Sequence, residues 1–180
     1  MERSFPKFSW LVVLILVCLL SACAQERVFT QPNSAMEPTV LEGEKFAVNG
    51  SAYRNSTPVR GDVVVLRHGD ILVLKRVIAV SSDTVEGRDF QVILSGTQLQ
   101  EAYVQHTGKN SDPPPSFSFL KNFGPTKVPI GQIFVMGDNR DFSNDSRDPS
   151  FGTISVSDVL GKALRIVKSS NSGREGTVIH

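Results

Sequence analysis

The sequence predicts an all-β domain, mainly antiparallel and barrel-like, that follows an N-terminal apolar segment. Three observations favour this fold class. Short runs rich in valine, isoleucine and leucine recur along the chain, turn signals separate them about every 8–12 residues, and no long amphipathic helix pattern is present. The 180 residues are enough for one domain of average size with a single hydrophobic core.

Residues 1–24 have the pattern of a secretion signal or a membrane anchor. Arg3 and Lys7 precede eleven consecutive apolar residues, Trp10–Leu20. The four residues that end at Cys23 resemble the lipobox of bacterial lipoproteins, in which the cysteine is lipidated. We therefore expect either a lipid anchor at Cys23 or an uncleaved transmembrane helix, with a cleaved soluble product as the third alternative. Both anchors hold the downstream domain at the membrane, outside the cytoplasm.

Residues 25–168 are expected to form the folded domain, and residues 169–180 a flexible tail. The chain from Gln25 to Asn33 is expected to be a polar connector, and Pro38 keeps the residue before it extended, so a loop follows. Expected strands cover residues 45–48, 63–66, 71–80, 92–94, 99–104, 128–136 and 156–167. A turn at Gly131 interrupts the strand at residues 128–136, and a short helical turn begins the last one. The turn at residues 67–70 predicts an antiparallel hairpin. Residues 105–117 are polar and contain three prolines, which is typical of an exposed loop.

Composition narrows the range of functions. The net charge of +1 gives no reason to expect nucleic acid as a partner. Both cysteines, Cys18 and Cys23, lie in the N-terminal segment, so no disulfide or cysteine-rich metal site is expected in the domain. The three histidines are scattered and no cofactor fingerprint is visible, so we expect neither a metal nor an organic cofactor. The sequence leaves the oligomeric state unknown.

The expected strand at residues 71–80 carries the most informative side chain. Eight of its ten residues are apolar, and it contains no glycine or proline, which is typical of a strand covered on both faces. Lys75 lies in its middle, on the same face as Val73 and Val77. Lowering the pKa of a buried lysine from about 10.4 to roughly 8 costs about 3 kcal/mol. This cost makes sense where a neutral amine serves as a general base; the alternative is a lysine whose ammonium reaches water.

Three segments, Ser34–Thr39, Arg60–Ile78 and Gly137–Arg147, occur in this order and resemble the motifs of the bacterial type I signal peptidases. These are membrane-bound serine endopeptidases with a Ser–Lys dyad. The resemblance extends from about Pro32 to Val167. It implies a signal-peptidase fold and hydrolysis of one peptide bond in an exported preprotein. It also implies that the lipid bilayer is a functional partner, because the bilayer brings enzyme and substrate to one surface.

The resemblance also implies a role for individual residues. Lys75 would be the general base, and Ser143 would hydrogen-bond to its amine. Asp145 and Arg147 would form a supporting ion pair, and Gly137 would let the backbone pack close to the lysine.

Residues 138–148 hold six charges, a density that on its own is typical of a solvated turn. The functional interpretation requires Ser143 to face inward. A calcium loop is the other alternative, because Asp141, Ser143 and Asp145 alternate, but the glycine that such a loop needs is missing.

The sequence departs from the family motif at the nucleophile. The family places the reactive serine directly before the methionine, whereas here Ala35 precedes Met36 and Ser34 stands one position earlier. Asn33 falls where the family often has a serine in the oxyanion hole, and its amide could donate the same hydrogen bond alongside the N–H of Ala35. Met36 and Leu74 are expected to line a shallow apolar substrate cleft, with an ordinary core position as the alternative.

Four interpretations of this departure stay open. Ser34 acts as a displaced nucleophile, or the chain is an inactive homologue that still binds extended peptides. Alternatively, Ala35 is a substitution that traps an inactive form, or water attacks directly with Lys75 as base. Two rival classes are a Ser–Lys peptidase of another kind, such as a self-cleaving repressor or a conjugation-pilus processing enzyme, and a structural lipoprotein. A repressor would need a DNA-binding segment, which the sequence lacks, and a structural lipoprotein leaves the three motifs unexplained.

Overall fold

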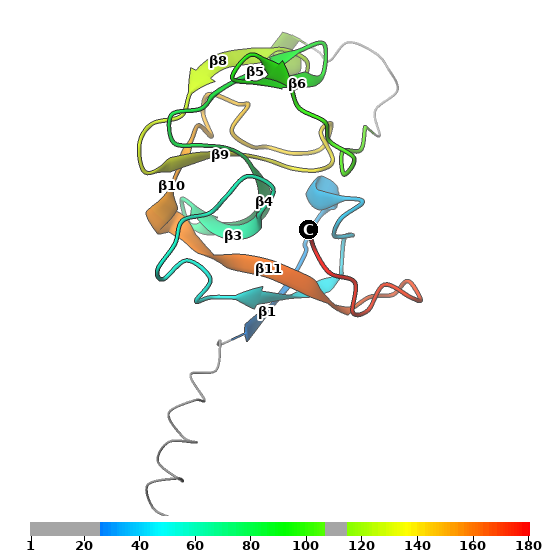
Figure 1. Cartoon of the computed structure of the whole chain (residues 1–180). Coiled ribbons are helices and arrows are strands. Elements are labelled where there is room, and N and C mark those ends of the chain that lie inside the picture. The colour runs from blue at the N-terminus through cyan, green and yellow to red at the C-terminus, as the bar shows by residue number, and fades with distance from the viewer. Residues whose placement is uncertain (1–25, 107–114) are drawn as a thin grey trace, which may run out of the picture.

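A computed structural model describes residues 26–106 and 115–180, which fold into two antiparallel sheets. The larger sheet has seven strands in the order β1-β2-β11-β3-β4-β9-β10, and the smaller has four in the order β7-β6-β5-β8. Figure 1 shows the smaller sheet at one end of the domain and β1 at the other. The strands are β1 Glu26–Thr30, β2 Lys45–Asn49, β3 Val63–His68, β4 Ile71–Val80, β5 Thr84–Arg88, β6 Gln91–Leu94, β7 Thr97–Gln98, β8 Phe123–Lys127, β9 Gln132–Met136, β10 Ile154–Ser155 and β11 Val159–Lys168.

The helical elements of the described residues are three 3-10 helices, η1 Ser34–Met36, η2 Pro115–Leu120 and η3 Val156–Asp158. Every pairing between the named strands is antiparallel. The prediction of an all-β, antiparallel domain is therefore confirmed.

Strand β4 lies inside the larger sheet and supplies part of its core. It forms the predicted hairpin with β3, from His68↔Ile71 to Val63↔Arg76. Its other neighbour, β9, pairs with it only from Arg76 onward. The first five residues of β4 therefore have one edge that no described strand covers. Burial on both faces was expected along the whole strand, but Ile71 and Leu72 are exposed, since they lie beyond the end of β9.

Several boundaries differ from the sequence prediction. The polar connector forms a strand, β1, because it pairs with β2 along its whole length. Residues 99–104 do not form the expected strand, since Glu101 and Tyr103 instead take part in a polar network beside the loop from Gly137 to Arg147. Strands β5 and β8 were not predicted.

The prediction of a flexible tail at residues 169–180 is also wrong. Ile179 is 5% exposed and belongs to the main hydrophobic cluster. Arg174 forms an ion pair with Glu44, whose side chain is buried. The sequence of the tail does not predict these two contacts, because a single isoleucine and a single arginine give no periodic signal.

The predicted anchor at residues 1–24, including Cys23, lies outside the described residues. In the part of the chain that the structure describes, none of the helices has the length and hydropathy of a transmembrane span.

Candidate active site

Lys75 lies in the middle of β4, and its amine is enclosed by the protein. The residue is 4% exposed, and its Nζ donates a hydrogen bond of 2.9 Å to Ser143 Oγ. Burial lowers the pKa of the Lys75 amine from its ordinary 10.5. The negative charge of Asp145 opposes this shift, and the positive charge of Arg147 adds to it. The amine is therefore biased toward the neutral form that a general base requires.

Asp145 and Arg147 form a buried, two-pronged ion pair, with Nε–Oδ1 at 2.8 Å and Nη2–Oδ2 at 2.9 Å. The N–H of Gly137 also donates to Asp145 Oδ2, at 2.9 Å. Burial by itself would raise the pKa of the Asp145 carboxyl, but Arg147, with a smaller effect of Lys75, holds that pKa below its usual 3.8. The Ser143 side chain adds a smaller contribution to the lowered pKa of Asp145.

Gly137 is the point at which two segments of the site meet. A Cβ atom at this position would lie 2.3 Å from Ser143 Oγ and 2.5 Å from the carbonyl oxygen of Ala35. No side chain fits such a space. The close approach predicted for Gly137 is therefore present, but the atoms that require it belong to Ser143 and Ala35.

Asn33 caps η1, the turn that carries Ala35. Its side-chain Oδ1 accepts the N–H of Ala35 at 3.1 Å. The buried Gln31 side chain holds Asn33 in place, with Nε2 donating to the backbone carbonyl of Asn33 at 2.9 Å and to its Oδ1 at 3.1 Å. The two groups expected to donate to an oxyanion thus bond to each other. A substrate carbonyl would have to displace Asn33 Oδ1 to reach the N–H of Ala35.

The turn η1 is tied to the loop that follows β9. Asn139 donates its backbone N–H to the carbonyl of Ala35 at 3.1 Å and its side-chain Nδ2 to the carbonyl of Ser34 at 3.2 Å. Ala35 is 5% exposed, Ser34 is half-buried, and Met36 is fully buried in the main hydrophobic cluster. Successive side chains of a 3-10 turn point about 120° apart, so these three residues face different surroundings. Met36 was expected to line the cleft, and the structure places it in the core instead.

A groove of about 230 Å³ lies between the segment before η1 and the first half of β4. It is lined by Gln31, Pro32, Asn33, Ile71, Leu72, Val73, Leu74 and Lys75. The lining thus includes three candidate site residues from the sequence, Leu74, Lys75 and Asn33. It also includes the uncovered edge of β4.

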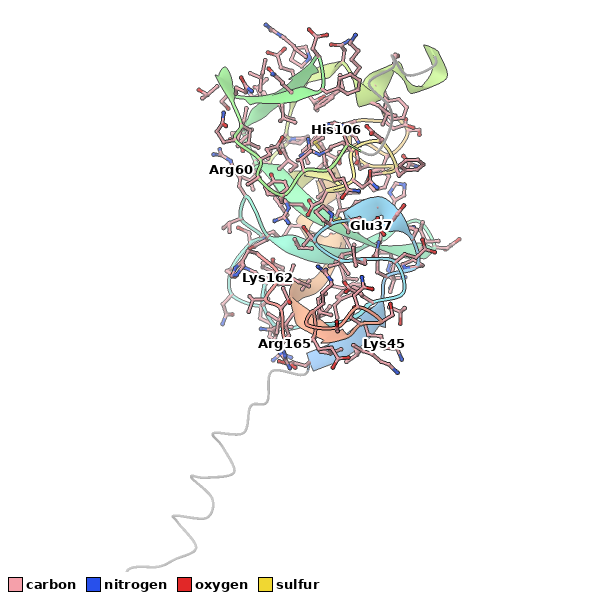
Figure 2. The ribbon with its side chains drawn as sticks, turned by 90° about the vertical axis from the view of Figure 1, so that its right-hand side faces the viewer. Glu37, Lys45, Arg60, His106, Lys162 and Arg165 are labelled. Atoms are coloured by element: carbon pink, nitrogen blue, oxygen red, sulfur yellow. The ribbon has the colours of Figure 1, made fainter. Side chains whose placement is uncertain are left out.

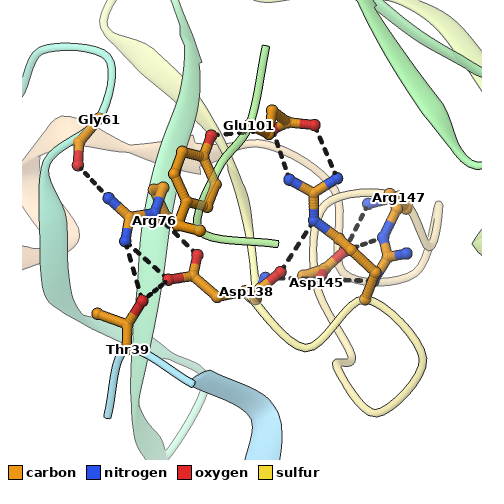
Figure 3. A network of polar contacts seen from close by, with 10 residues as sticks. Thr39, Gly61, Arg76, Glu101, Asp138, Asp145 and Arg147 are labelled. Atoms are coloured by element: carbon orange, nitrogen blue, oxygen red, sulfur yellow. Dashed lines mark hydrogen bonds and ion pairs between the residues drawn. The ribbon is translucent and has the colours of Figure 1, made fainter. Parts of the chain in front are cut away.

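A polar network that the sequence did not predict lies beside these residues (Figure 3). Arg76 donates to both carboxylate oxygens of Asp138, at 2.8 and 2.7 Å, and to the carbonyl of Gly61 at 2.8 Å. Its guanidinium lies over the Tyr103 ring, 3.9 Å from the centroid. Thr39 donates to Asp138 at 2.5 Å. Arg76 alternates with Lys75 on a buried strand, so a carboxylate partner could have been inferred for it.

Arg140 forms a third buried ion pair of the same loop, after those of Asp145 and Asp138. It contacts both carboxylate oxygens of Glu101, at 3.1 and 2.5 Å, and donates to the carbonyl of Gly137 at 3.1 Å. The charge density of residues 138–148 was typical of a solvated turn, yet the loop is largely internal because each buried charge has a partner.

The calcium-loop alternative finds no support in this geometry. Ser143 bonds to Lys75, Asp145 bonds to Arg147, and Asp141 lies 3.0 Å from His106 Nδ1. Within the described residues, no group of three or more acidic, histidine or cysteine side chains is arranged to hold a metal ion.

The chain matches known proteins over the region that contains these motifs. The family model "Signal peptidase, peptidase S26" matches residues 4–167. Probable signal peptidase I-1 of Synechocystis sp. is 33% identical, over 93% of this chain and 84% of that protein. Signal peptidase I V of Bacillus subtilis is 33% identical, over 84% of this chain and 94% of that protein. A crystal structure of a signal peptidase I from Enterococcus faecalis is 29% identical and covers 59% of this chain, with a TM-score of 0.47.

The family match spans nearly all of the chain up to the end of β11, and it includes η1, β4 and the loop from Gly137 to Arg147. The chain therefore belongs to the signal peptidase family, peptidase S26, a family of serine peptidases.

Proposed function

We propose that this chain is a signal peptidase I-like endopeptidase that acts on exported preproteins at the membrane surface, with Lys75 as its general base. The observation that carries the proposal is the enclosed amine of Lys75, whose pKa is lowered by burial and which lies 2.9 Å from Ser143 Oγ. A pure binding protein has little reason to keep such an amine, because its burial opposes folding. Membership of the peptidase S26 family supports the same reaction class.

The uncovered edge of β4 supports an extended substrate. Between Ile71 and Lys75 the edge opposite β3 has no described strand, so a peptide can add there by main-chain hydrogen bonds. A peptide bound in this way runs along the groove toward the Lys75 amine. Apolar residues, Leu74 among them, line the groove, which suits the small residues that the family prefers before the cut.

The proposed reaction is an acyl transfer followed by hydrolysis. The neutral Lys75 amine takes the proton of a serine hydroxyl, and the resulting alkoxide attacks the scissile carbonyl to form a tetrahedral intermediate. The N–H of Ala35 and the amide of Asn33 stabilise its oxyanion once the cap between them opens. The protonated Lys75 then gives its proton to the leaving amine, and water releases the acyl group. No metal or organic cofactor takes part.

Ser34 is the proposed nucleophile in the sequence as it stands. It is the serine nearest along the chain to the family's position, it is half-buried, and its carbonyl is held by Asn139. Attack by Ser34 requires η1 to turn, since neighbouring side chains in the turn point about 120° apart.

The second candidate function is binding of extended signal peptides without cleavage, and Ala35 favours it. The carbonyl of Ala35 and the hydroxyl of Ser143 approach the same point at Gly137. Position 35 therefore lies against the loop that orients Lys75, and a methyl group there cannot attack a carbonyl.

One experiment separates these functions: the full chain, purified in detergent, is incubated with a preprotein and the cut product is followed. Cleavage that is lost in Ser34→Ala supports the displaced nucleophile. Cleavage that appears only in Ala35→Ser supports the binding function for the native sequence. Cleavage that persists unchanged in Lys75→Ala would refute the dyad.

We also propose that residues 1–24 tether the domain outside the cytoplasm, either as a transmembrane helix or through lipid on Cys23. Mass spectrometry of the chain isolated from membranes distinguishes the two, because lipidation makes Cys23 the new N-terminus and adds the mass of the acyl chains. The intact N-terminus without added mass would exclude the lipid anchor.

A further inference from the structure

We propose that residues 174–180 form a C-terminal clamp that fixes η1 against β4 and so sets the position of residue 35 relative to the Lys75 amine. The inference rests on the proposed function of this site. The clamp lies beyond the family match, which ends at residue 167, so it is a feature of this chain rather than of the family model. In Figure 1 the red C-terminal segment turns back into the domain and ends beside the blue turn η1.

The clamp is held by the edge of β11. Gly176 donates to the carbonyl of Ile166, Ile166 donates to the carbonyl of Thr177, and Ile179 donates to the carbonyl of Leu164, each at 2.9 Å. Strand β3 pairs with β11 only up to Lys162. Beyond Lys162 the clamp therefore replaces β3 as the hydrogen-bonded neighbour of β11.

Arg174 joins the clamp to the segment that follows η1. Its Nη2 donates to the carbonyl of Pro38 at 3.2 Å and to that of Thr39 at 3.0 Å, while Nε contacts Glu44 Oε1 at 2.6 Å. Glu44 is 2% exposed and also accepts the N–H of Leu41 at 2.8 Å. One guanidinium thus binds the chain between η1 and β2 at three points.

The end of the clamp reaches the other side of the site. Ile179 belongs to the hydrophobic cluster that contains both Met36, next to position 35, and Leu74, next to Lys75. The carbonyl of His180 accepts a hydrogen bond from Nη1 of Arg76, the residue that directly follows Lys75 in β4. The contacts of the clamp therefore fall on the two segments that carry the reacting positions.

This arrangement gives the clamp a positioning role. If the clamp is released, the segment after η1 loses its bonds to Arg174 and Met36 loses Ile179 as a neighbour in the cluster, while the bonds of η1 to Asn139 remain, so η1 moves relative to β4. Water then reaches the Lys75 amine, and the desolvation that lowers its pKa is relieved.

The test uses the full chain in detergent and measures the pH dependence of Lys75 acetylation by acetic anhydride, read by mass spectrometry. In Arg174→Ala and Ile179→Ala the midpoint should move up toward 10.5, the ordinary pKa of lysine. Arg174→Lys keeps the charge beside Glu44 and should recover part of the native midpoint. In an Ala35→Ser background, kcat should fall about 10- to 100-fold with little change in KM.

Two matched controls separate positioning from loss of stability. Arg60→Ala removes an arginine that pairs with a buried carboxylate, Asp83, as Arg174 pairs with Glu44, and Figure 2 shows Arg60 apart from Glu37, which directly follows η1. Ile154→Ala removes an isoleucine that is 5% exposed, as Ile179 is, but in a different hydrophobic cluster. Both controls should keep the native midpoint.

The proposal is overturned if the clamp variants keep the native midpoint, or if the controls shift it equally. The midpoint is read in the native sequence without any cleavage, so an inactive chain would refute the proposed function and leave this test intact.

Discussion

Replacing Gly137 with alanine should separate the two halves of the site. The added Cβ would lie 2.5 Å from the carbonyl oxygen of Ala35, about 1 Å inside an ordinary contact. A backbone oxygen cannot rotate away, so η1 and the loop that carries Ser143 must move apart by about that distance. Overpacking of this kind destabilises by about 1–3 kcal/mol, and a 1 Å displacement of reacting groups lowers a rate about 100-fold.

Gly161→Ala is the matched control for this substitution. A Cβ at Gly161 would lie 2.5 Å from the carbonyl oxygen of Asn49, so the clash is of the same kind, but it falls between β11 and β2. Urea unfolding should show a similar loss of stability in both variants. Cleavage in an Ala35→Ser background should fall only in Gly137→Ala. Equal cleavage by the two variants would refute the assignment of Gly137 to the site.

Three further predictions concern the ion pair, the amine and the groove. Asp145→Asn leaves the Arg147 guanidinium buried without its partner and should lower the free energy of unfolding by about 3–5 kcal/mol, measured in urea; a loss below about 1 kcal/mol would contradict the buried pair. Lys75→Met should raise the free energy of unfolding at neutral pH. This gain should shrink as the pH approaches 10.5. The folded-state pKa of Lys75 is lowered, so the native chain becomes more stable as the pH rises from that lowered pKa to 10.5. A gain that is independent of pH would contradict the lowered pKa. Leu72 is 43% exposed on the groove wall, so Leu72→Asp should leave stability nearly unchanged but weaken binding of an apolar peptide about tenfold, measured by fluorescence anisotropy; unchanged affinity would place the peptide elsewhere.

The sequence predicted those parts of the site that depend on local pattern. The apolar run around Lys75 predicted a buried strand, and the resemblance of the three motifs to the signal peptidases implied that Ser143 would meet the lysine from a segment 68 residues away. The turn at residues 67–70 correctly predicted the hairpin of β3 with β4.

The parts that were missed depend on partners distant in the sequence. Six charges in residues 138–148 are typical of a solvated turn until Arg76 and Glu101 are known to lie opposite them. The anchoring of Ile179 could not be predicted either, because one apolar residue in a polar tail has no periodicity. The cap of Asn33 on Ala35 depends on which end of an amide faces an N–H, which no residue pattern encodes.

The most direct test of a neutral, buried Lys75 amine is its titration by NMR in the native sequence, with the chain labelled at lysine Cε and the resonance assigned through Lys75→Arg. We expect this amine to titrate below 10.5, apart from the exposed lysines, and Asp145→Asn to lower its pKa further because a nearby negative charge is removed. If the Lys75 amine titrates together with the exposed lysines, it is not held neutral by burial, and the proposed peptidase chemistry is contradicted.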